Sequence, residues 1–428
     1  MTRGLEAWLA HISAQHPATI ALGLDRVLEV AGRMEISLAL GGGPGRGSST
    51  VVITVGGTNG KGSTCAFLER ILIEAGYRVG LYTSPHLLRY NERVRIGGED
   101  ASDQALVESF ERVEAARGET LLTYFEFGTL SALWLFERAE LDAVILEVGL
   151  GGRLDAVNIV DADASIVVSV DLDHQAFLGN DREAIGFEKA GIYRAGRPAI
   201  FGGPQPPQRL EQHAREIGAE LLRLGVEFRY EAQERQWDFI GVRGNRRALP
   251  IPALRGGWQL ANASCALMAL ETLEERLPVS LGEVKRGLAN VRLPGRLQVL
   301  PGRPAVVLDV AHNPHAARSL ASGLGDMGFF ENTIAVFGVL ADKDIAGVIE
   351  EMKGRIDRWH VAAPLADRAA SAATVANVLA EKGLGEATRS FTSIESALDT
   401  ARRDAGPNDR IVVFGSFYTV AEALRSSR

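Results

Sequence analysis

The feature that most constrains this chain is a series of short, uniformly apolar runs separated by segments with helical spacing. Strands that are buried on only one face alternate apolar and polar residues, whereas strands buried on both faces are apolar throughout. The segments between the runs, 63–75 and 129–139, carry apolar residues at helical spacing. This alternation predicts a parallel α/β sheet covered by helices. The expected strands are VVITV, VGLY, AVILEV and IVVSV, at 51–55, 79–82, 143–148 and 166–170.

A second series of apolar runs begins near residue 300 and predicts a second, smaller α/β domain. The segment LPGRLQVLPGRP (293–304) is dense in proline and glycine and is the best candidate for a linker. A length of 428 residues, at roughly 150 residues per domain, also favours two or three domains. We therefore expect a mostly parallel sheet domain over 1–297 and a Rossmann-like domain over 298–428. The second series has expected strands at 306–310, 334–340, 359–363 and 411–414, with helices at 316–324 and 373–382.

Composition and the N-terminal residues narrow the class of protein. With 46% hydrophobic and 23% charged residues, the chain is expected to be a soluble globular protein. The net charge of −8 argues against nucleic acid as a partner, and two cysteines exclude a disulfide framework. Neither a secretory signal nor a membrane span is found, so we expect a cytoplasmic protein without a membrane partner. We also expect a monomer, although this does not follow from the sequence pattern. Before the first strand we expect helices at 5–12 and 22–34 and a flexible lead-in at 41–50.

The first strand runs into a glycine-rich loop, GGTNGKGST at 56–64, that is followed by a helix. Glycines allow the backbone N–H groups to point at phosphate oxygens, and the helix N-terminus and Lys61 add positive charge. The loop is a variant of the general phosphate-binding pattern because Val55 and Gly62 replace a glycine and a hydroxyl residue. Ser63 or Thr64 would then supply the hydroxyl for Mg²⁺. A glycine-rich turn without a ligand is the structural alternative.

Polar residues also follow two other strands of the first series. Glu147 lies near the end of the run AVILEV, and His174 follows IVVSV in the sequence DLDH. Ligands of parallel α/β sheets bind at the carboxyl ends of the strands. With Ser84 in the loop after VGLY, these residues would supply oxygen and imidazole ligands to a Mg²⁺ ion on ATP. The alternatives are a salt-bridged Glu147 and a His174 that is merely exposed.

The second series repeats this arrangement. The run VVLDV contains Asp309 near its end and is followed by Ala311-His312-Asn313-Pro314. IAVFGVL leads into Ala341-Asp342-Lys343-Asp344, and IVVFG leads into Ser416-Phe417-Tyr418. All three clusters are expected at one edge of the second sheet. Helix capping for Asn313 and a solvated charge pair for Lys343 and Asp344 are the alternatives. We further expect the polar edges of the two domains to face each other across a crevice.

These motifs together resemble the folylpolyglutamate synthase family, whose wider relatives are the muramyl peptide ligases. Two further segments, TSPHLLRYNERVRI and LTYFEFGTLSALWLF, are similar to the bacterial bifunctional dihydrofolate synthase/folylpolyglutamate synthases. The resemblance extends over nearly the whole chain in the same order. The motifs that carry it are GTNGKGS, TSPHL, EVGLGGRLDA, DH with LG, EKAGI, PGR, DVAHNPHAA and DKD.

The resemblance implies an ATP-dependent amide ligase with a Mur-ligase-like first domain. ATP would phosphorylate a substrate carboxylate, and the amine of L-glutamate would then displace phosphate. Such a reaction depends on positioning and charge neutralisation. The implied magnesium ligands are Ser84, Glu147 and His174. The implied ATP contacts are Thr58, Asn59, Gly60, Lys61, Gly62, Ser63, Asn262, Arg296 and Asp309.

The resemblance also implies three catalytic groups, Lys61, Lys189 and His312. Lys189 of EKAGI matches a lysine that relatives carry as a carbamate, which is a carboxylate and would hold a second Mg²⁺. An ordinary lysine on a helix surface is the alternative. Tyr418 stands where some relatives have histidine, and Trp258 of GGWQLANA likewise replaces a histidine of many relatives, so only Gln259 and Asn262 are matched in that segment.

For the acceptor substrate, the resemblance implies a dihydropteroate or reduced-folate pocket. A flat aromatic ligand needs a ring such as Phe125 to stack on and an acceptor such as Asp155 for its N–H groups. A core position for Phe125 is the alternative. The implied pocket residues are Leu22, Gly23, Thr123, Tyr124, Phe125, Glu126, Leu154, Asp155 and Ala156.

Three other functions remain open from the sequence. One is a polyglutamylase that acts only on folates, which turnover assays with dihydropteroate and with tetrahydrofolate would distinguish. A muramyl peptide ligase would depend on a uridine nucleotide, and the LTYFEFG segment argues against it. A nucleotide-binding switch is a different class of protein, but a GTPase would need an Asn-Lys-x-Asp guanine reader, and Ala341-Asp342-Lys343-Asp344 lacks the asparagine.

Overall fold

The computed structural model describes residues 3–18, 20–37 and 50–426, and the predicted flexible lead-in at 41–50 lies almost wholly outside these residues. The described chain forms two compact units. The first comprises residues up to Ala253 together with Leu260–Val291, and the second comprises Leu254–Gln259 together with Arg292–Arg428. The short segment before Leu260 thus groups with the second unit. The division at 297/298 stays a prediction.

In the described residues of the first unit, the main sheet has eight strands. Its central strands are parallel, and only β3 and β4 at one edge run antiparallel to their neighbours. The four strands expected from the apolar runs all lie side by side in it, in the order β2-β5-β1-β6. Across the sheet the strands are β4 (Glu99–Asp100), β3 (Val94–Ile96), β2 (Val79–Tyr82), β5 (Ala143–Glu147), β1 (Val51–Gly56), β6 (Ala164–Val167), β7 (Pro198–Phe201) and β8 (Glu220–Arg223).

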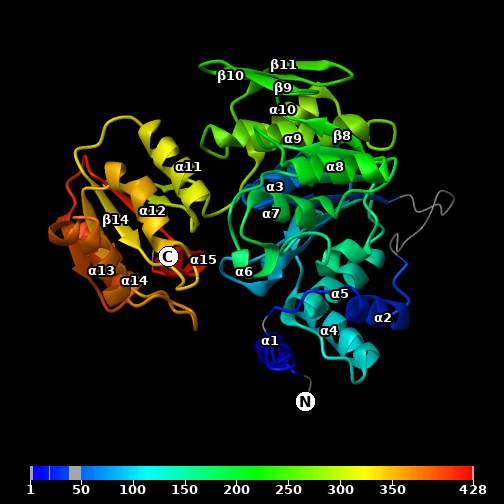
Figure 1. Ribbon diagram of the computed structural model, residues 1–428, viewed down its shortest axis with the longest axis horizontal. Coiled ribbons are helices and arrows are strands. Elements are labelled where there is room, and N and C mark those ends of the chain that lie inside the picture. The colour runs from blue at the N-terminus through cyan, green and yellow to red at the C-terminus, as the bar shows by residue number, and fades with distance from the viewer. Residues whose placement is uncertain (1–2, 19, 38–49, 427–428) are drawn as a thin grey trace. The chain divides into compact units, whose positions relative to one another are not determined.

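Both faces of this sheet are buried, which explains the uniformly apolar runs. Val52 and Val144 belong to one large core cluster with helices α1, α2, α4 and α5, whereas their neighbours Val51 and Ile53 are buried on the other face. These four helices pack together as one layer (Figure 1). The helices of this unit are α1 (Leu5–Ser13), α2 (Asp25–Arg33), α3 (Lys61–Glu74), α4 (Asp103–Arg117), α5 (Tyr124–Glu137), α6 (Gln175–Leu178), α7 (Arg182–Ala190), α8 (Gln208–Ile217), most of α9 (Trp258–Thr272) and α10 (Leu281–Asn290), with 3₁₀ turns η1 (Tyr90–Arg93) and η2 (Ala156–Ile159).

A small antiparallel sheet of three described strands was not predicted. It contains β9 (Arg229–Ala232), β10 (Gln236–Ile240) and β11 (Asn245–Pro250), and it packs against α10 (Figure 1). Its outer strands are largely exposed, whereas Trp237 and Phe239 of β10 are fully buried. Apolar periodicity is therefore confined to one strand, and the outer two leave no such signal in the sequence.

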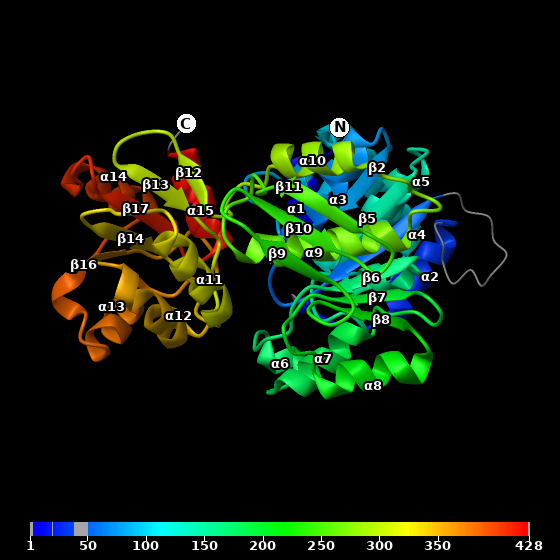
Figure 2. The ribbon, with the colours of Figure 1, turned by 90° about the horizontal axis from the view of Figure 1, so that it is seen from above.

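In the described residues of the second unit, the sheet has six strands in the order β12-β13-β17-β14-β15-β16. All neighbours are parallel except β12, which is antiparallel to β13. The segment predicted to link the domains is not a bare connection, because it contains β12. Figure 2 shows the strands between α11–α13 on one side and α14 and α15 on the other. The strands are β12 (Gln298–Leu300), β13 (Ala305–Leu308), β14 (Thr333–Phe337), β15 (Arg358–Val361), β16 (Thr388–Ser390) and β17 (Arg410–Phe414); the helices are α11 (Pro314–Gly325), α12 (Ile345–Met352), α13 (Ala372–Glu381), α14 (Ile394–Asp404) and α15 (Phe417–Arg425), with 3₁₀ turns η3 (Lys353–Arg355) and η4 (Gly385–Ala387).

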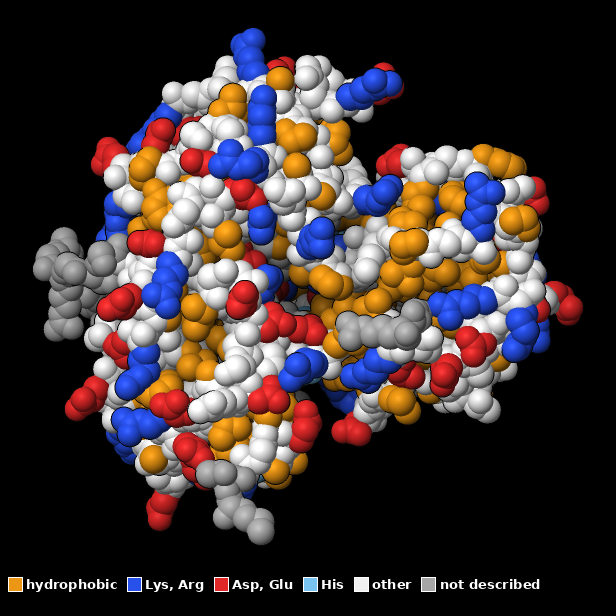
Figure 3. Space-filling model, turned by 180° about the vertical axis from the view of Figure 1, so that it is seen from behind, with side chains coloured by type: hydrophobic (Ala, Val, Ile, Leu, Met, Phe, Trp, Pro, Cys, Tyr) orange, Lys and Arg blue, Asp and Glu red, His pale blue; other side chains and the backbone are white. Residues whose placement is uncertain are grey.

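The predicted class, a mostly parallel α/β sheet with a smaller Rossmann-like α/β unit, is therefore confirmed. Several predicted strand ends reach two or three residues too far, because the last apolar residues of a run lie in the loop beyond the ladder. On the face seen in Figure 3, cationic and anionic side chains are interspersed on both units. No helix in the described part of the chain is long and apolar enough to cross a membrane.

Candidate active site

The glycine-rich loop has the backbone conformation that phosphate binding requires. Strand β1 ends at Gly56, and α3 begins at Lys61, two residues before the predicted start. Gly60 has a φ of 87° and is the N-cap of α3. Gly57 has a φ of 142°, and a Cβ atom there would lie 3.1 Å from the backbone nitrogens of Val168 and Ser169. The chain can therefore turn at these points only with glycine, and the turn places the N-terminus of α3, which favours an anion, at the loop.

The loop is held in this shape by the residues that follow β6. The backbone nitrogen of Thr58 donates to the carbonyl of Ser169 at 2.8 Å, and that of Asn59 donates to the Ser169 hydroxyl at 3.0 Å. The same hydroxyl donates to the carbonyl of Asn59 at 2.9 Å, and the Thr58 hydroxyl donates to the carbonyl of Asp171 at 3.1 Å. Ser169 was not among the predicted site residues. The sequence signal that could have identified Ser169 is its position near the end of the predicted strand IVVSV.

Lys61 and Asn262 both lie at this loop. The Lys61 Nζ donates to the carbonyl of Gly57 at 3.0 Å and lies 3.4 Å from that of Thr58, so the ammonium group folds back over the loop. Asn262, from α9, has its side-chain oxygen 2.5 Å from the point where a Cβ atom at Gly60 would be. The structure thus brings together the predicted phosphate loop and the predicted ATP contact from a segment 200 residues further along.

Glu147 lies at the carboxyl end of β5, next to the loop that carries Ser84. The Ser84 backbone nitrogen donates to Glu147 Oε2 at 3.1 Å, and the Glu147 side chain is buried. The negative charge of Glu147 and the positive charge of Lys61 both act on the pKa of the buried Cys65 thiol, which burial raises well above its ordinary value. Glu147 is therefore a neighbour of the first turn of α3. The hydroxyl of Thr64 in this turn is buried with no hydrogen-bond partner among the described residues.

These donors fit a hard divalent cation, because Mg²⁺ prefers carboxylate and hydroxyl oxygens. A buried carboxylate and an unpartnered buried hydroxyl are both costly without such a ligand. Within the described ranges, no group of three or more His, Cys, Asp and Glu side chains could hold a metal ion. A metal at this edge would accordingly depend on hydroxyl oxygens, on substrate phosphates or on a modified lysine as well as on Glu147.

His174 and Lys189 lie in different environments. His174 has a φ of 52°, and its Nε2 lies 4.0 Å from Asp173 Oδ1 with the side chain 37% exposed. Lys189 is only 4% exposed, although it is near the end of α7. Burial, strengthened by the charge of Lys61, lowers the pKa of Lys189 to about 7, whereas Asp173 and Asp155 oppose this shift. The alternative of an ordinary surface lysine is therefore excluded for Lys189.

Asp155 is the buried acid of this region. Its carboxylate accepts hydrogen bonds from the backbone nitrogens of Leu150 at 2.8 Å and Val157 at 3.1 Å. Burial nevertheless raises the pKa of Asp155 to about 7, against the effect of these bonds and of Lys61. A carboxyl group with this pKa exchanges between an acceptor and a donor near neutral pH.

The three segments predicted to form the acceptor pocket come together around Asp155. The Gly23 backbone nitrogen donates to the carbonyl of Leu154 at 3.2 Å, which joins the loop before α2 to the loop before η2. Thr123 is the N-cap of α5 and forms a reciprocal capping box with Glu126. Helices α2 and α5 both pack against η2, which contains Ala156.

Phe125 in the first turn of α5 is half-buried. A Cβ atom at Gly149 would lie 2.7 Å from its ring, and the ring centroid of Tyr82 is 5.8 Å away. Phe125 packs against the core without belonging to its fully buried members. The ring thus rests on a glycine backbone and keeps an exposed part, which suits a stacking role better than a core role.

In the second unit, Arg296, Asp309 and His312 lie around the carboxyl end of β13. The Asp309 carboxylate accepts from the backbone nitrogens of Leu297 at 2.7 Å and Ala311 at 2.8 Å, and burial raises its pKa despite the nearby Arg296 charge. The Arg296 guanidinium lies 5.1 Å from the ring centroid of Phe417. His312 Nδ1 lies 2.8 Å from the carbonyl oxygen of Val310. Asn313 caps α11 by accepting from the nitrogen of Ala316, so the capping alternative is confirmed for that residue.

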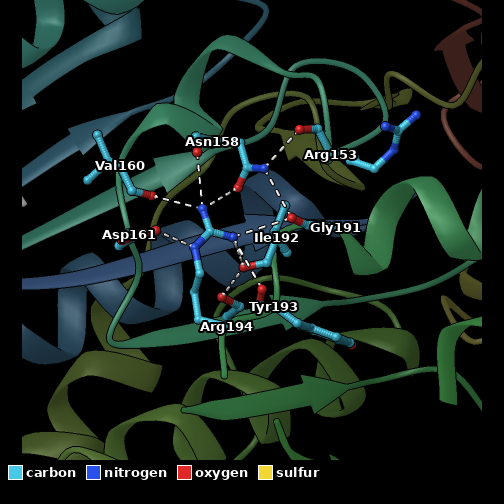
Figure 4. A network of polar contacts seen from close by, with 9 residues as sticks. Arg153, Asn158, Val160, Asp161, Gly191, Ile192, Tyr193 and Arg194 are labelled. Atoms are coloured by element: carbon cyan, nitrogen blue, oxygen red, sulfur yellow. Dashed lines mark hydrogen bonds and ion pairs between the residues drawn. The ribbon is translucent and has the colours of Figure 1, made fainter. Parts of the chain in front are cut away.

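A network centred on Arg194 joins the Asp155 loop to the end of α7 (Figure 4). The guanidinium donates to Asn158 Oδ1 at 2.9 Å and to the carbonyl of Ile192 at 3.1 Å, and it pairs with Asp161. The Asn158 amide in turn donates to the carbonyls of Arg153 and Gly191. The segments that carry Asp155 and Lys189 are thereby tied to each other. Sequence analysis did not single out Arg194, since its partners are spread over 36 positions.

Comparison with known proteins gives one consistent result. Residues 295–417 match the model of the Mur ligase glutamate ligase domain family. The chain is 47% identical to the dihydrofolate synthase/folylpolyglutamate synthase of Escherichia coli strain K12, over 98% of this chain and 94% of that protein. It superposes on the structure of E. coli FolC in complex with DHPP and ADP with a TM-score of 0.91 at 45% identity, covering 99% of this chain and 97% of that one.

A second solved structure agrees. It is described as a bifunctional folylpolyglutamate synthase/dihydrofolate synthase with Mn, AMPPNP and L-glutamate bound, and it matches with a TM-score of 0.90 at 45% identity over 100% of this chain and 98% of that one. The matched lengths leave no large part of either chain unaccounted for. Together with the phosphate loop, the buried carboxylates and the buried lysine, these matches show that the chain belongs to the dihydrofolate synthase/folylpolyglutamate synthase family.

Proposed function

We propose that this chain is an ATP-dependent amide ligase that adds L-glutamate to dihydropteroate, giving dihydrofolate, and to tetrahydrofolate, extending its glutamate chain. The observation that carries the proposal is the grouping of Lys61, Glu147 and Lys189 at the carboxyl edge of a parallel sheet, in a chain 47% identical to such an enzyme over 98% of its length. The ligands named for the solved relatives correspond to parts of this reaction: L-glutamate is its amine, ADP its nucleotide product, AMPPNP an analogue of ATP and Mn a divalent metal.

The residues of the site supply what this chemistry needs. A carboxylate resists attack by an amine, so ATP first transfers its γ-phosphoryl group to the carboxylate oxygen, which gives an acyl phosphate and ADP. The glutamate amine then attacks the acyl carbon, the amide bond forms and phosphate leaves. The loop N–H groups and Lys61 bind and orient the phosphates. Bound Mg²⁺ neutralises phosphate charge, and Glu147, Ser84 and His174 are its proposed ligands.

The remaining assignments are part of the same proposal. The proposed nucleotide contacts are Thr58 to Ser63, Asn262, Arg296 and Asp309. His312 is assigned to the catalytic groups on the family resemblance. For the acceptor, Phe125 stacks on the pterin ring and Asp155 hydrogen-bonds its N–H groups. The other proposed pocket residues are Leu22, Gly23, Thr123, Tyr124, Glu126, Leu154 and Ala156.

A paired-substrate assay tests the reaction. The chain is incubated with ATP, Mg²⁺ and L-glutamate and either dihydropteroate or tetrahydrofolate, and both ADP release and the product mass are measured. We expect ADP and a product heavier by one glutamate residue with each acceptor. If the chain turns over tetrahydrofolate but not dihydropteroate, it is a folylpolyglutamate synthase without dihydrofolate synthase activity. Absence of turnover with both acceptors would leave a nucleotide-binding protein that ligates nothing.

Lys189 is proposed to carry a carbamate that completes a second magnesium site. Its support is burial without an ion pair to a carboxylate among the described residues, which is an unusual position for an unmodified ammonium group. We expect a carbamate carbon signal in the ¹³C NMR spectrum of protein equilibrated with ¹³C-bicarbonate. The Lys189→Arg variant keeps the charge but forms no carbamate, and it should lack both the signal and the activity. A wild-type spectrum without the signal would contradict the modification.

We also propose that the protein acts as a monomer in the cytoplasm and takes no nucleic acid. Light scattering coupled to size exclusion should then give a mass near 46.0 kDa. Twice that mass at working concentration would contradict the monomer. Cell fractionation and a gel-shift experiment with DNA and RNA test the other two points.

A further inference from the structure

Arg26 is a charged residue of α2 that no sequence motif singled out. Its guanidinium forms a two-pronged contact with Glu126 at the start of α5, with Nη2 2.7 Å and Nε 3.2 Å from Oε1. Nη2 also donates to the carbonyl of Ala21 at 3.0 Å. Arg26 therefore connects the loop before α2 to the first turn of α5, although 100 residues separate it from Glu126 in the chain.

The Glu126 carboxylate takes part both in this contact and in the N-terminal capping box of its own helix, α5. Its side chain is 4% exposed, whereas that of Arg26 is 31% exposed. Glu126 Oε2 accepts from the backbone nitrogen of Thr123 at 2.7 Å, and the Glu126 nitrogen lies 3.3 Å from the Thr123 hydroxyl. Both carboxylate oxygens thus have partners within the protein. This favours a supporting part for Glu126 over the direct substrate contact that the family resemblance implied.

The Arg26–Glu126 pair is connected to all three segments of the proposed pterin pocket. Ala21 immediately precedes Leu22 and Gly23, and Gly23 is bonded to Leu154 next to Asp155. Thr123 and Glu126 fix the start of α5, which carries Phe125 one residue before Glu126. A shift of either partner would therefore move the loop at 21–23 relative to the Phe125 ring. A small displacement of this kind is enough to weaken binding of a rigid bicyclic ligand.

We propose that the Arg26–Glu126 ion pair is a positioning device that sets the spacing between the 21–23 loop and Phe125, and so the affinity for the pterin part of the acceptor. The inference rests on the proposed function and deepens it. Among the described residues the printed partners of Arg26 are Glu126 and Ala21, neither of which belongs to the phosphate loop, so its effect should be specific to the acceptor. A guanidinium is required because its fork reaches a carboxylate and a carbonyl at once, which an ammonium group on a lysine does less well.

The test compares Michaelis constants of full-length variants. Arg26→Gln should raise the KM for dihydropteroate about tenfold or more, while the KM for ATP stays within about twofold. Arg26→Lys should fall between Arg26→Gln and wild type. The matched control is Arg33→Gln in the same helix, because Arg33 pairs with the exposed Glu29 and bonds to carbonyls at the end of α4. Its two Michaelis constants should match those of wild type.

A double-mutant cycle separates positioning from simple loss of stability. Glu126→Gln keeps an acceptor for the Thr123 nitrogen but removes the ionic partner. If the two residues act as one unit, combining Arg26→Gln with Glu126→Gln raises the KM for dihydropteroate no further than the worse single variant does. Additive increases, or equal increases in the KM for ATP and for dihydropteroate, would overturn the proposal.

Failure of the proposed function and failure of the positioning role give different experimental results. Wild type that does not ligate dihydropteroate refutes the proposed function itself. Active wild type with an unchanged KM for dihydropteroate in a folded Arg26→Gln variant refutes only the positioning role. If Arg26→Gln does not fold because the buried Glu126 carboxylate has lost its ionic partner, the KM of the Arg26→Lys variant for dihydropteroate is the test. Lysine keeps a positive charge at this position. An unaltered KM in that folded variant would then refute the proposal.

Discussion

The side-chain oxygen of Asn262 occupies the space into which any side chain at Gly60 would project, 2.5 Å from the Cβ position. Gly60 also has a φ of 87°, a conformation that favours glycine. The tip of the phosphate loop and α9 are therefore fitted to each other at one contact. The contact with Asn262 allows the steric effect of a side chain at position 60 to be separated from the effect of a left-handed backbone conformation.

Gly60→Ala should lower kcat/KM for ATP about 100-fold or more, because the new methyl group displaces Asn262 and the loop tip. Gly76→Ala is the matched control. Gly76 has the same φ of 87° at the other end of α3, but nothing lies within 4 Å of its Cβ position. It should lose about 1 kcal/mol of stability and keep its activity. Equal activities of the two variants in a steady-state assay would contradict this account of the loop.

Lys61→Ala should strongly reduce ligation and leave the fold intact. Nζ folds over the carbonyls of Gly57 and Thr58, and its charge is the full positive charge of the loop. We expect kcat to fall about 100-fold or more, with an unchanged circular dichroism spectrum. Arg70→Ala removes a cation from the same helix and should have little effect, since Arg70 forms an i,i+4 pair with Glu74. Near-normal turnover in Lys61→Ala would refute the phosphate-binding role.

Asp155→Asn should change how stability depends on pH. Burial raises the pKa of Asp155 from 3.8 to about 7, so the folded state binds a proton that the unfolded state has lost between these values. The contribution of this group to stability is complete below about pH 4 and is lost as the pH rises through about 7. Asparagine does not titrate. The free energy of unfolding of the variant should therefore improve relative to wild type from pH 5 to pH 8.

Urea unfolding at four pH values measures this difference for Asp155→Asn. Asp103→Asn is the control, because the Asp103 carboxylate is 57% exposed and pairs with Arg89 at the surface. Its difference from wild type should not vary comparably with pH. A constant difference between Asp155→Asn and wild type over the same range would show that the carboxyl group is ionised throughout.

Arg194→Lys should destabilise the protein by about 3 kcal/mol, because one ammonium group cannot replace the many hydrogen bonds of the guanidinium to Asn158, Asp161 and the nearby carbonyls. Arg197→Lys is the comparison, since the half-exposed Arg197 side chain pairs with Asp163 at 3.3 Å, and Asp163 keeps Arg276 as a second partner. It should cost less than about 1 kcal/mol. Equal midpoints in chemical denaturation would show that the network in Figure 4 adds little stability.

The sequence predicted best those elements whose burial leaves a local pattern. Strands β1, β2, β5 and β6 are buried on both faces, and their apolar runs identified them. The start of α3 was placed too late because Lys61 and Gly62 carry no apolar signal, and only the left-handed Gly60 marks the helix start. Strands β9 and β11 escaped prediction because their residues are mostly exposed.

The candidate site divides in the same way. Lys61 lies in a motif directly after one predicted strand and Glu147 lies near the end of another, so their common location follows from the parallel sheet. Asp155 was identified through the family resemblance. Ser169, Arg26 and Arg194 act through partners far away in the chain, and no local pattern marks such pairs. The burial of Lys189 could not be predicted from the sequence either, because the charged residues of α7, REAIGFEKA, give no indication of which of them is covered.

The Ser169 hydroxyl, which both accepts from and donates to the backbone of Asn59, has a consequence for the energetics of nucleotide capture. Because Ser169 already fixes the phosphate loop before the nucleotide binds, the loop loses little conformational entropy on binding. More of the intrinsic attraction for the triphosphate is then realised as affinity.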